Sequence, residues 1–153
     1  MRIVVIIALA VVLAGCTLVP AALQPTPTPA CQAEVSAYLD KMRPLVGKFS
    51  DTTKLANSTA RIALAPIVRD MQQIRRDMID IPSPQCAKPA VLLISEGTDL
   101  IVNNYIRFIA KEDEKSIAHD MAMGADKFTD GMAQLTALAA GAKETPTPAW
   151  AFK

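Results

Sequence analysis

The sequence has almost no excess charge and contains a single histidine. Lys and Arg number 16 against 15 Asp and Glu, which gives a formal net charge of +1 at pH 7. Such a chain lacks the basic surface that attracts nucleic acid or anionic lipid, so neither is expected as the main partner. A Ser-His-Asp triad would have to use His119, because no other histidine is present.

Motifs that hold cofactors or reacting groups are also missing. The sequence has no Cys-x-x-Cys pair, no Cys-x-x-Cys-His haem attachment and no glycine-rich phosphate loop. It also lacks the Glu-x-x-His pairs with which helical bundles bind two iron ions. These absences predict a protein that is not an enzyme and that has no cofactor and no metal ligands.

The nearest approach to a metal motif is His119, Met121 and Met123. Imidazole and thioether groups suit Cu(I), but helical residues two positions apart point in nearly opposite directions. We therefore expect Met121 in the core and the other two outside it. A metal-binding bundle is kept only as a weaker alternative.

Two other polar segments allow more than one interpretation. Asn103 and Asn104, beside Tyr105, could line a polar pocket or make hydrogen bonds between helices. The acidic run at 112–114 is typical of a solvated loop that caps a helix.

Uncharged apolar residues form one long run, at the N-terminus. Ile3 to Leu13 follow the positive Arg2, which is the layout of a secretory signal peptide. The run is too short to span a hydrocarbon core, which needs about 20 apolar residues. It ends in Leu13-Ala14-Gly15-Cys16, where Cys16 is one of three cysteines.

This ending resembles the lipobox of bacterial lipoproteins, and the resemblance covers residues 1–16 only. It implies that residues 1–15 are removed and that the Cys16 sulfur receives a diacylglycerol, often with acylation of the new amino group. Acyl chains of the palmitate type would then anchor the protein, since each buried CH₂ contributes about 0.8 kcal/mol. The expected location is the cell envelope, on the outer face of the plasma membrane or on the outer membrane. The alternative is an ordinary secretory signal with Cys16 as a core thiol.

The remaining cysteines, Cys31 and Cys86, form an even pair, and in an oxidising compartment we expect a disulfide between them. A bridge that closes a loop of this size stabilises the fold by about 4 kcal/mol on the chain-entropy model. Two unpaired buried thiols are the alternative.

Pro and Thr alternate on both sides of the helical region. Gln24–Ala30 and Thr145–Pro148 favour extended polyproline II chain. We predict a lipidated cysteine and tether at 16–30, a helical domain at 31–141 and an irregular tail at 142–153.

Between these segments, apolar residues recur every three or four positions, which predicts packed helices. The first stripe consists of Val35, Tyr38, Leu39, Met42, Leu45, Val46 and Phe49. The second consists of Ala60, Leu64, Ile67, Met71, Ile74, Met78 and Ile81. The third consists of Val91, Ile94, Thr98, Ile101, Tyr105 and Phe108. The fourth consists of Ile117, Met121, Gly124, Phe128, Gly131, Leu135 and Leu138.

Capping and breaking residues divide the four segments. Ser50–Thr53 are expected to end the first helix and cap the second. Pro82 and Pro84 stop the second, Asp113 caps the fourth and Gly141 ends it. Two further prolines, at 44 and 66, fall inside helical patterns. They predict kinks or, for the second, a late helix start.

Short connections favour antiparallel neighbours, so the predicted fold is all-α: an up-down-up-down four-helix bundle. This topology puts Cys31 and Cys86, which precede the first and third helices, at the same end. Gly97, Gly124 and Gly131 allow close helix contact or leave a groove. A groove favours a module that binds a protein or small-molecule ligand, whereas filled positions favour a structural envelope lipoprotein.

The lipobox resemblance generates the first prediction. Cells grown with labelled fatty acid should tag the protein at Cys16, and Cys16→Ala should release it from the membrane fraction. Equal labelling of the Cys16→Ala variant would contradict the predicted anchor.

Overall fold

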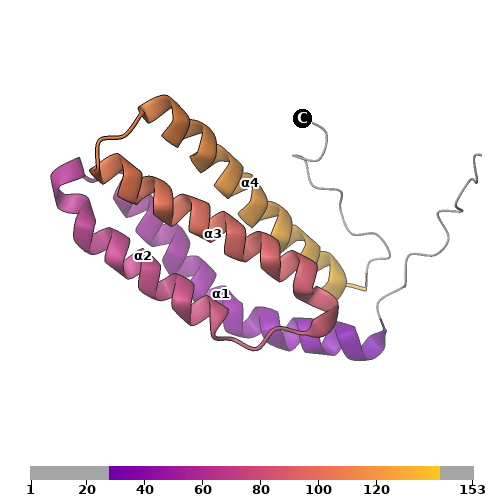
Figure 1. Cartoon of the computed structure of the whole chain (residues 1–153). Helices are drawn as coiled ribbons and strands as arrows, with labels where there is room; N and C mark the ends of the chain where they lie inside the picture. Colours follow the sequence, from indigo (N-terminus) through magenta and orange to yellow (C-terminus); the bar gives the residue numbers. More distant parts are fainter. Residues whose placement is uncertain (1–27, 142–153) are drawn as a thin grey trace, which may run out of the picture.

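The chain folds as a four-helix bundle. The computed structural model describes residues 28–141, so the predicted signal peptide, Cys16, most of the tether and the tail lie outside the described residues. Its elements are α1 (Pro29–Asn57), η3 (Arg61–Ala63), α2 (Leu64–Ile79), η4 (Gln85–Ala87), α3 (Lys88–Ile109) and α4 (Glu114–Ala139). Consecutive helices run antiparallel, and α1 also packs against α4 (Figure 1). The predicted all-α, up-down-up-down bundle is confirmed.

Helix α1 begins at Pro29, two residues before the predicted start of the domain. The Thr28 side chain accepts a hydrogen bond from the Cys31 amide at 3.3 Å, and Pro29 occupies the first helical position. Proline suits that position because its missing N–H would have no partner inside the helix. The same Pro/Thr pattern that predicts extended chain therefore also supplies a helix start.

The prediction that Ser50–Thr53 ends the first helix is wrong. Helix α1 continues through this segment to Asn57. Thr52 and Thr53 donate to the carbonyls four residues earlier, at 2.7 and 2.8 Å, so their hydroxyls bond within the helix instead of capping a new one. The first helix consequently has 29 residues and the second only 16.

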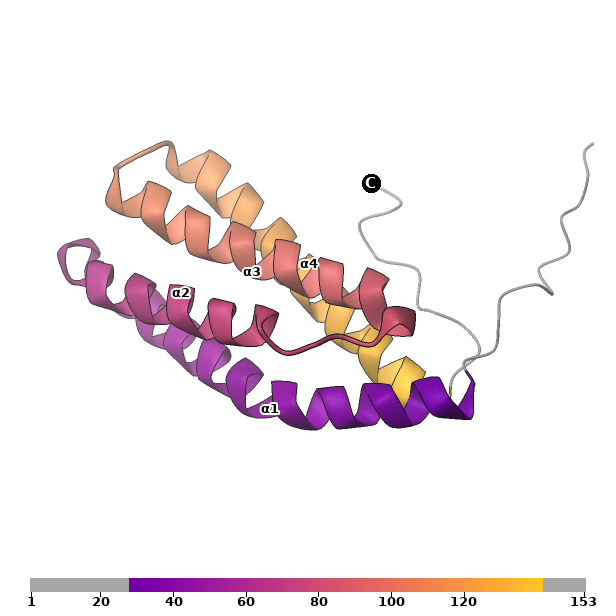
Figure 2. The same ribbon diagram turned by 60° about the horizontal axis from the view of Figure 1, so that its bottom comes forward.

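The two interior prolines have different positions. Pro66 lies in the first turn of α2, as the interpretation of a late start predicts. Pro44 lies inside α1, where it removes one backbone hydrogen bond. Figure 2 shows that α1 bends about midway along its length. We attribute the bend to this proline.

The remaining boundary predictions are confirmed. Helix α2 ends at Ile79, just before Pro82. The Asp113 carboxylate accepts from the Ser116 amide at 2.8 Å and caps α4. Gly141 follows α4 with φ of 74°, a left-handed conformation that glycine adopts without strain.

The predicted stripes form the core. The largest side chains that are fully buried come from α1, α2 and α4: Val35, Met42, Leu64, Met71 and Leu135. The stripe of α3 is also buried at Ile94, Thr98, Ile101 and Tyr105. Ala60, at the start of the second stripe, is exposed in the connection before η3.

Helices α3 and α4 are in close backbone contact. A Cβ atom placed on Gly97 would lie 2.6 Å from the Phe128 nitrogen and 2.7 Å from the Gly124 oxygen. One on Gly131 would lie 2.7 Å from the Ala90 oxygen. The three glycines therefore allow close contact between the helices and leave no groove.

The start of α1 and the end of α4 lie side by side in both ribbon views (Figures 1 and 2). The predicted disulfide is present at this end, where it joins Cys31 of α1 to Cys86 of η4 with a Cα–Cα distance of 6.3 Å. We call this the disulfide end of the bundle. In the described part of the chain, no helix combines the length and the apolar character needed to cross a membrane.

The glycine contacts generate the second prediction. Gly97→Ala should lower the free energy of unfolding by about 1–3 kcal/mol, because the new methyl group meets backbone atoms of α4. Gly47→Ala is the matched control: it lies in α1 with nothing within 4 Å of the added Cβ. That variant should be stabilised by about 0.5–1 kcal/mol. Chemical denaturation measures both, and the same sign of change in the two variants would contradict the packing.

Candidate functional site

The most distinctive surface lies where α2 stops short of the disulfide end. Helix α2 ends at Ile79, and an extended segment carries the chain from there to η4 (Figure 2). We call residues 80–84 the strap. Because the strap is thinner than a helix, it leaves an open groove on each side.

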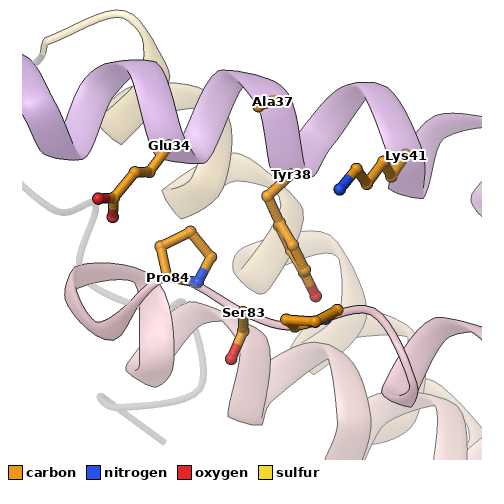
Figure 3. A pocket seen from close by; sticks show the side chains of 7 residues that line it. Glu34, Ala37, Tyr38, Lys41, Ser83 and Pro84 are labelled. Carbon is orange, nitrogen blue, oxygen red and sulfur yellow. The ribbon is translucent and has the colours of Figure 1, made fainter.

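The first of these, which we call the α1 groove, lies between α1 and the strap and has a volume of about 290 Å³. Its lining residues are Glu34, Ala37, Tyr38, Lys41, Pro82, Ser83 and Pro84. The four residues from α1 follow a spacing of three and four, so they share one helix face. Figure 3 shows Glu34 and Lys41 at opposite ends, with Tyr38 between them and pointing toward the strap.

Tyr38 is mostly buried and contributes a polar group to this groove. Its side chain is only 4% exposed, and its hydroxyl has no hydrogen-bond partner within residues 28–141. Burial raises the pKa of Tyr38 above its usual 10, so the phenol keeps its proton at neutral pH. The groove therefore contains a hydrogen-bond donor that an incoming acceptor could use.

Two charged side chains mark the ends of the α1 groove. Glu34 and Lys41 are both exposed, and neither makes an ion pair with any residue of the described part. They are seven residues apart, or two helical turns, which separates their Cα atoms by about 10.5 Å. At that separation they do not neutralise each other, and both are accessible to a ligand.

The second groove lies between the strap and α3 and has a volume of about 390 Å³. It is lined by Ile79, Ile81, Ser83, Lys88, Val91, Leu92 and Ser95. Ile79 and Leu92 are 50% and 58% exposed, which is high for large apolar side chains. This α3 groove is a mainly apolar surface with one cation, Lys88, among its lining residues.

The three metal candidates of the sequence all lie on α4. His119 is exposed on α4, and Met121 and Met123 are half-buried. Residues 28–141 contain no group of three or more His, Cys, Asp or Glu side chains that could hold a metal ion.

The Asn103–Tyr105 segment makes hydrogen bonds between helices. The Tyr105 hydroxyl donates to Asn57 Oδ1 of α1 at 2.5 Å. Asn104 is buried and its Oδ1 accepts from Arg107, while its Nδ2 has no partner in the described part of the chain. Asn103 is exposed. The geometry favours the structural interpretation of this segment over a polar pocket.

Arg107 organises the connection between α3 and α4, a role that the sequence reasoning missed. Its guanidinium donates to Glu112 at 2.8 Å, Asp120 at 2.6 Å and Ser116 at 2.9 Å, besides Asn104. Hydrogen bonds to Glu112 and then to Asp120 raise its pKa above the ordinary arginine value. The acidic run caps α4 as predicted, but it is also engaged in ion pairs, since Glu114 binds Arg61 at 2.8 Å.

Other charges on the helix faces are also paired. Arg75 of α2 pairs with Asp99 of α3, and Lys127 of α4 binds Glu96 of α3 at 2.5 Å. Such pairs align neighbouring helices and contribute up to about 1 kcal/mol each when exposed. They leave Glu34 and Lys41 as the charged pair placed for a ligand at the α1 groove.

Comparison of the chain with protein-family models, with curated proteins and with solved structures gives no match. Its function is therefore inferred from its own residues.

Proposed function

We propose that this chain is a lipid-anchored, non-enzymatic interaction module of the cell envelope that binds a partner protein in the α1 groove. The observation that carries the proposal is the set of unused polar groups there: the Tyr38 hydroxyl with Glu34 and Lys41 on either side. Unpaired groups of opposite charge in a groove are suited to recognition of a complementary surface.

The openness of the groove supports a protein partner over a small molecule. Small-molecule sites enclose most of the ligand surface, whereas this groove is a channel between a helix and a strap. Its polar groups are a carboxylate, an ammonium, a phenol and the Ser83 hydroxyl. That set supports binding better than chemistry, since the exposed His119 lies on another helix, α4.

The anchor is proposed from the lipobox resemblance at Cys16. The predicted tether joins the bundle at Pro29, and the groove begins at Glu34, little more than one helical turn further along α1. Attachment at Cys16 would therefore hold the groove near the anchored end of the domain. The partner is expected at the same membrane surface.

A structural envelope lipoprotein is the second candidate, and one observation favours it. The positions at Gly97, Gly124 and Gly131 are filled by the neighbouring helix. The bundle could then serve as a rigid spacer whose surface recognises no single partner.

Cross-linking in intact cells distinguishes the two candidates and provides the third prediction. A photoreactive benzoylphenylalanine placed at Ala37, in the groove, should give one dominant cross-linked species. The same group at Ala118, exposed on α4, is the matched control and should give much less. Equal yields at the two positions would favour the structural candidate and contradict the binding site.

A further inference from the structure

We infer that the α1 groove binds a proline-rich segment in polyproline II conformation that carries a basic and an acidic side chain three positions apart. The inference deepens the proposed function, on which it rests, by naming the chemistry of the partner. Three observations support the inference: the spacing of Glu34 and Lys41, the unpaired Tyr38 hydroxyl and the shape of the groove.

The Cα spacing of the two charged residues is close to one turn of a polyproline II helix. Glu34 and Lys41 are separated by about 10.5 Å along α1. Residues three positions apart in polyproline II lie on the same side and are separated by about 9.3 Å. A basic side chain can therefore reach Glu34 while an acidic side chain of the same segment reaches Lys41.

The donor in the groove fits the backbone of such a segment. Polyproline II has no internal hydrogen bonds, so its carbonyl oxygens are available as acceptors. Tyr38 lies between the two charges and presents a protonated hydroxyl that has no partner in the described residues (Figure 3). A carbonyl from the middle of the bound segment would satisfy it.

The walls of the groove favour the same ligand. Pro82 and Pro84 line the side opposite α1, and Pro84 itself has polyproline II geometry, with φ of −60° and ψ of 141°. Proline rings of a bound segment can pack against these two rings.

Two other modes of peptide binding fit less well. A strand needs a sheet edge to pair with, and the described part of the chain contains no strand. A helix bound in a groove relies on apolar anchors along one of its faces. The α1 groove is lined by Glu34, Lys41 and Ser83 besides its apolar residues, so it suits such a face less well.

Synthetic peptides test the inference directly on the full chain in detergent micelles. The probe is a dye-labelled peptide of six prolines with one arginine and one glutamate three positions apart. It should bind about threefold to tenfold more tightly than the same peptide with glutamine at both positions, because two exposed ion pairs are added. The difference should shrink as salt is raised. Fluorescence anisotropy measures each dissociation constant.

Variants of the protein test whether the peptide binds in the α1 groove. Lys41→Glu should reverse the preference, so that a peptide with two arginines binds more tightly than the arginine–glutamate peptide. Lys48→Glu, which changes an exposed lysine of α1 outside the groove, should leave the preference unchanged. Tyr38→Phe removes only the hydroxyl and should weaken binding by about threefold to tenfold, with the helical signal and the melting temperature unchanged.

Several outcomes would overturn the inference. One is no difference between the charged and neutral peptides, and another is the same preference in Lys41→Glu as in the unchanged chain. Equal binding of a peptide with glycine in place of every proline would exclude the polyproline conformation. If these tests fail while Ala37 still cross-links one partner, the proposed function stands and only the proline-rich ligand is wrong.

Discussion

The length of α2 is the constraint on which the rest of this structure depends. Helix α1 has 29 residues and α4 has 26, but α2 has 16 because the chain reaches Pro82 soon afterwards. At 1.5 Å per residue, α2 is about 20 Å shorter than α1. The missing length must be covered by chain that is not helical, and the strap does so. The disulfide joins η4, just beyond the strap, to the first turn of α1 and so ties the η4 end of the strap to α1.

Both grooves exist because the strap occupies the place that a longer α2 would fill. If α2 were as long as α1, it would cover the face of α1 that carries Glu34, Tyr38 and Lys41. It would also cover the apolar face of α3 at Leu92. Between α3 and α4, by contrast, the glycines let the two helices pack with their backbones in contact. The α3–α4 contact is therefore filled, whereas the α1 groove presents unpaired polar groups.

The fold could be predicted from the sequence because its signals are periodic. Heptad spacing marked the core, and the positions of Cys31 and Cys86 agreed with the up-down-up-down topology. The failure at Ser50–Thr53 arose because serine and threonine cap helices in one context and bond to the i−4 carbonyl in another. That choice depends on whether the following residues pack, as Ala56 does.

The candidate site was harder to predict, since its residues have ordinary local signals. Tyr38 belongs to the core stripe, and Glu34 and Lys41 resemble any other charged residues on a helix surface. The prolines of the strap indicate only that a helix ends there. These residues come together because α2 is much shorter than α1. That difference in length can be recognised only once α1 is known to extend to Asn57. The role of Arg107 was not predicted for a similar reason. Three of its partners, Glu112, Ser116 and Asp120, lie on the other side of the turn between α3 and α4.

Hydrogen exchange of the full chain with and without the disulfide tests the central claim most directly. In the double variant Cys31→Ser/Cys86→Ser, the hydrogen-bonded amides within residues 80–88 and those of the first turns of α1 should lose protection. Within 80–88 these are the amides of Asp80, Ile81, Ala87 and Lys88. Amides near Gly97 and Gly124 should keep theirs, because the contact between α3 and α4 does not depend on the bridge. Unchanged protection of residues 80–88, or an equal loss throughout the bundle, would contradict the account of a strap held by the disulfide.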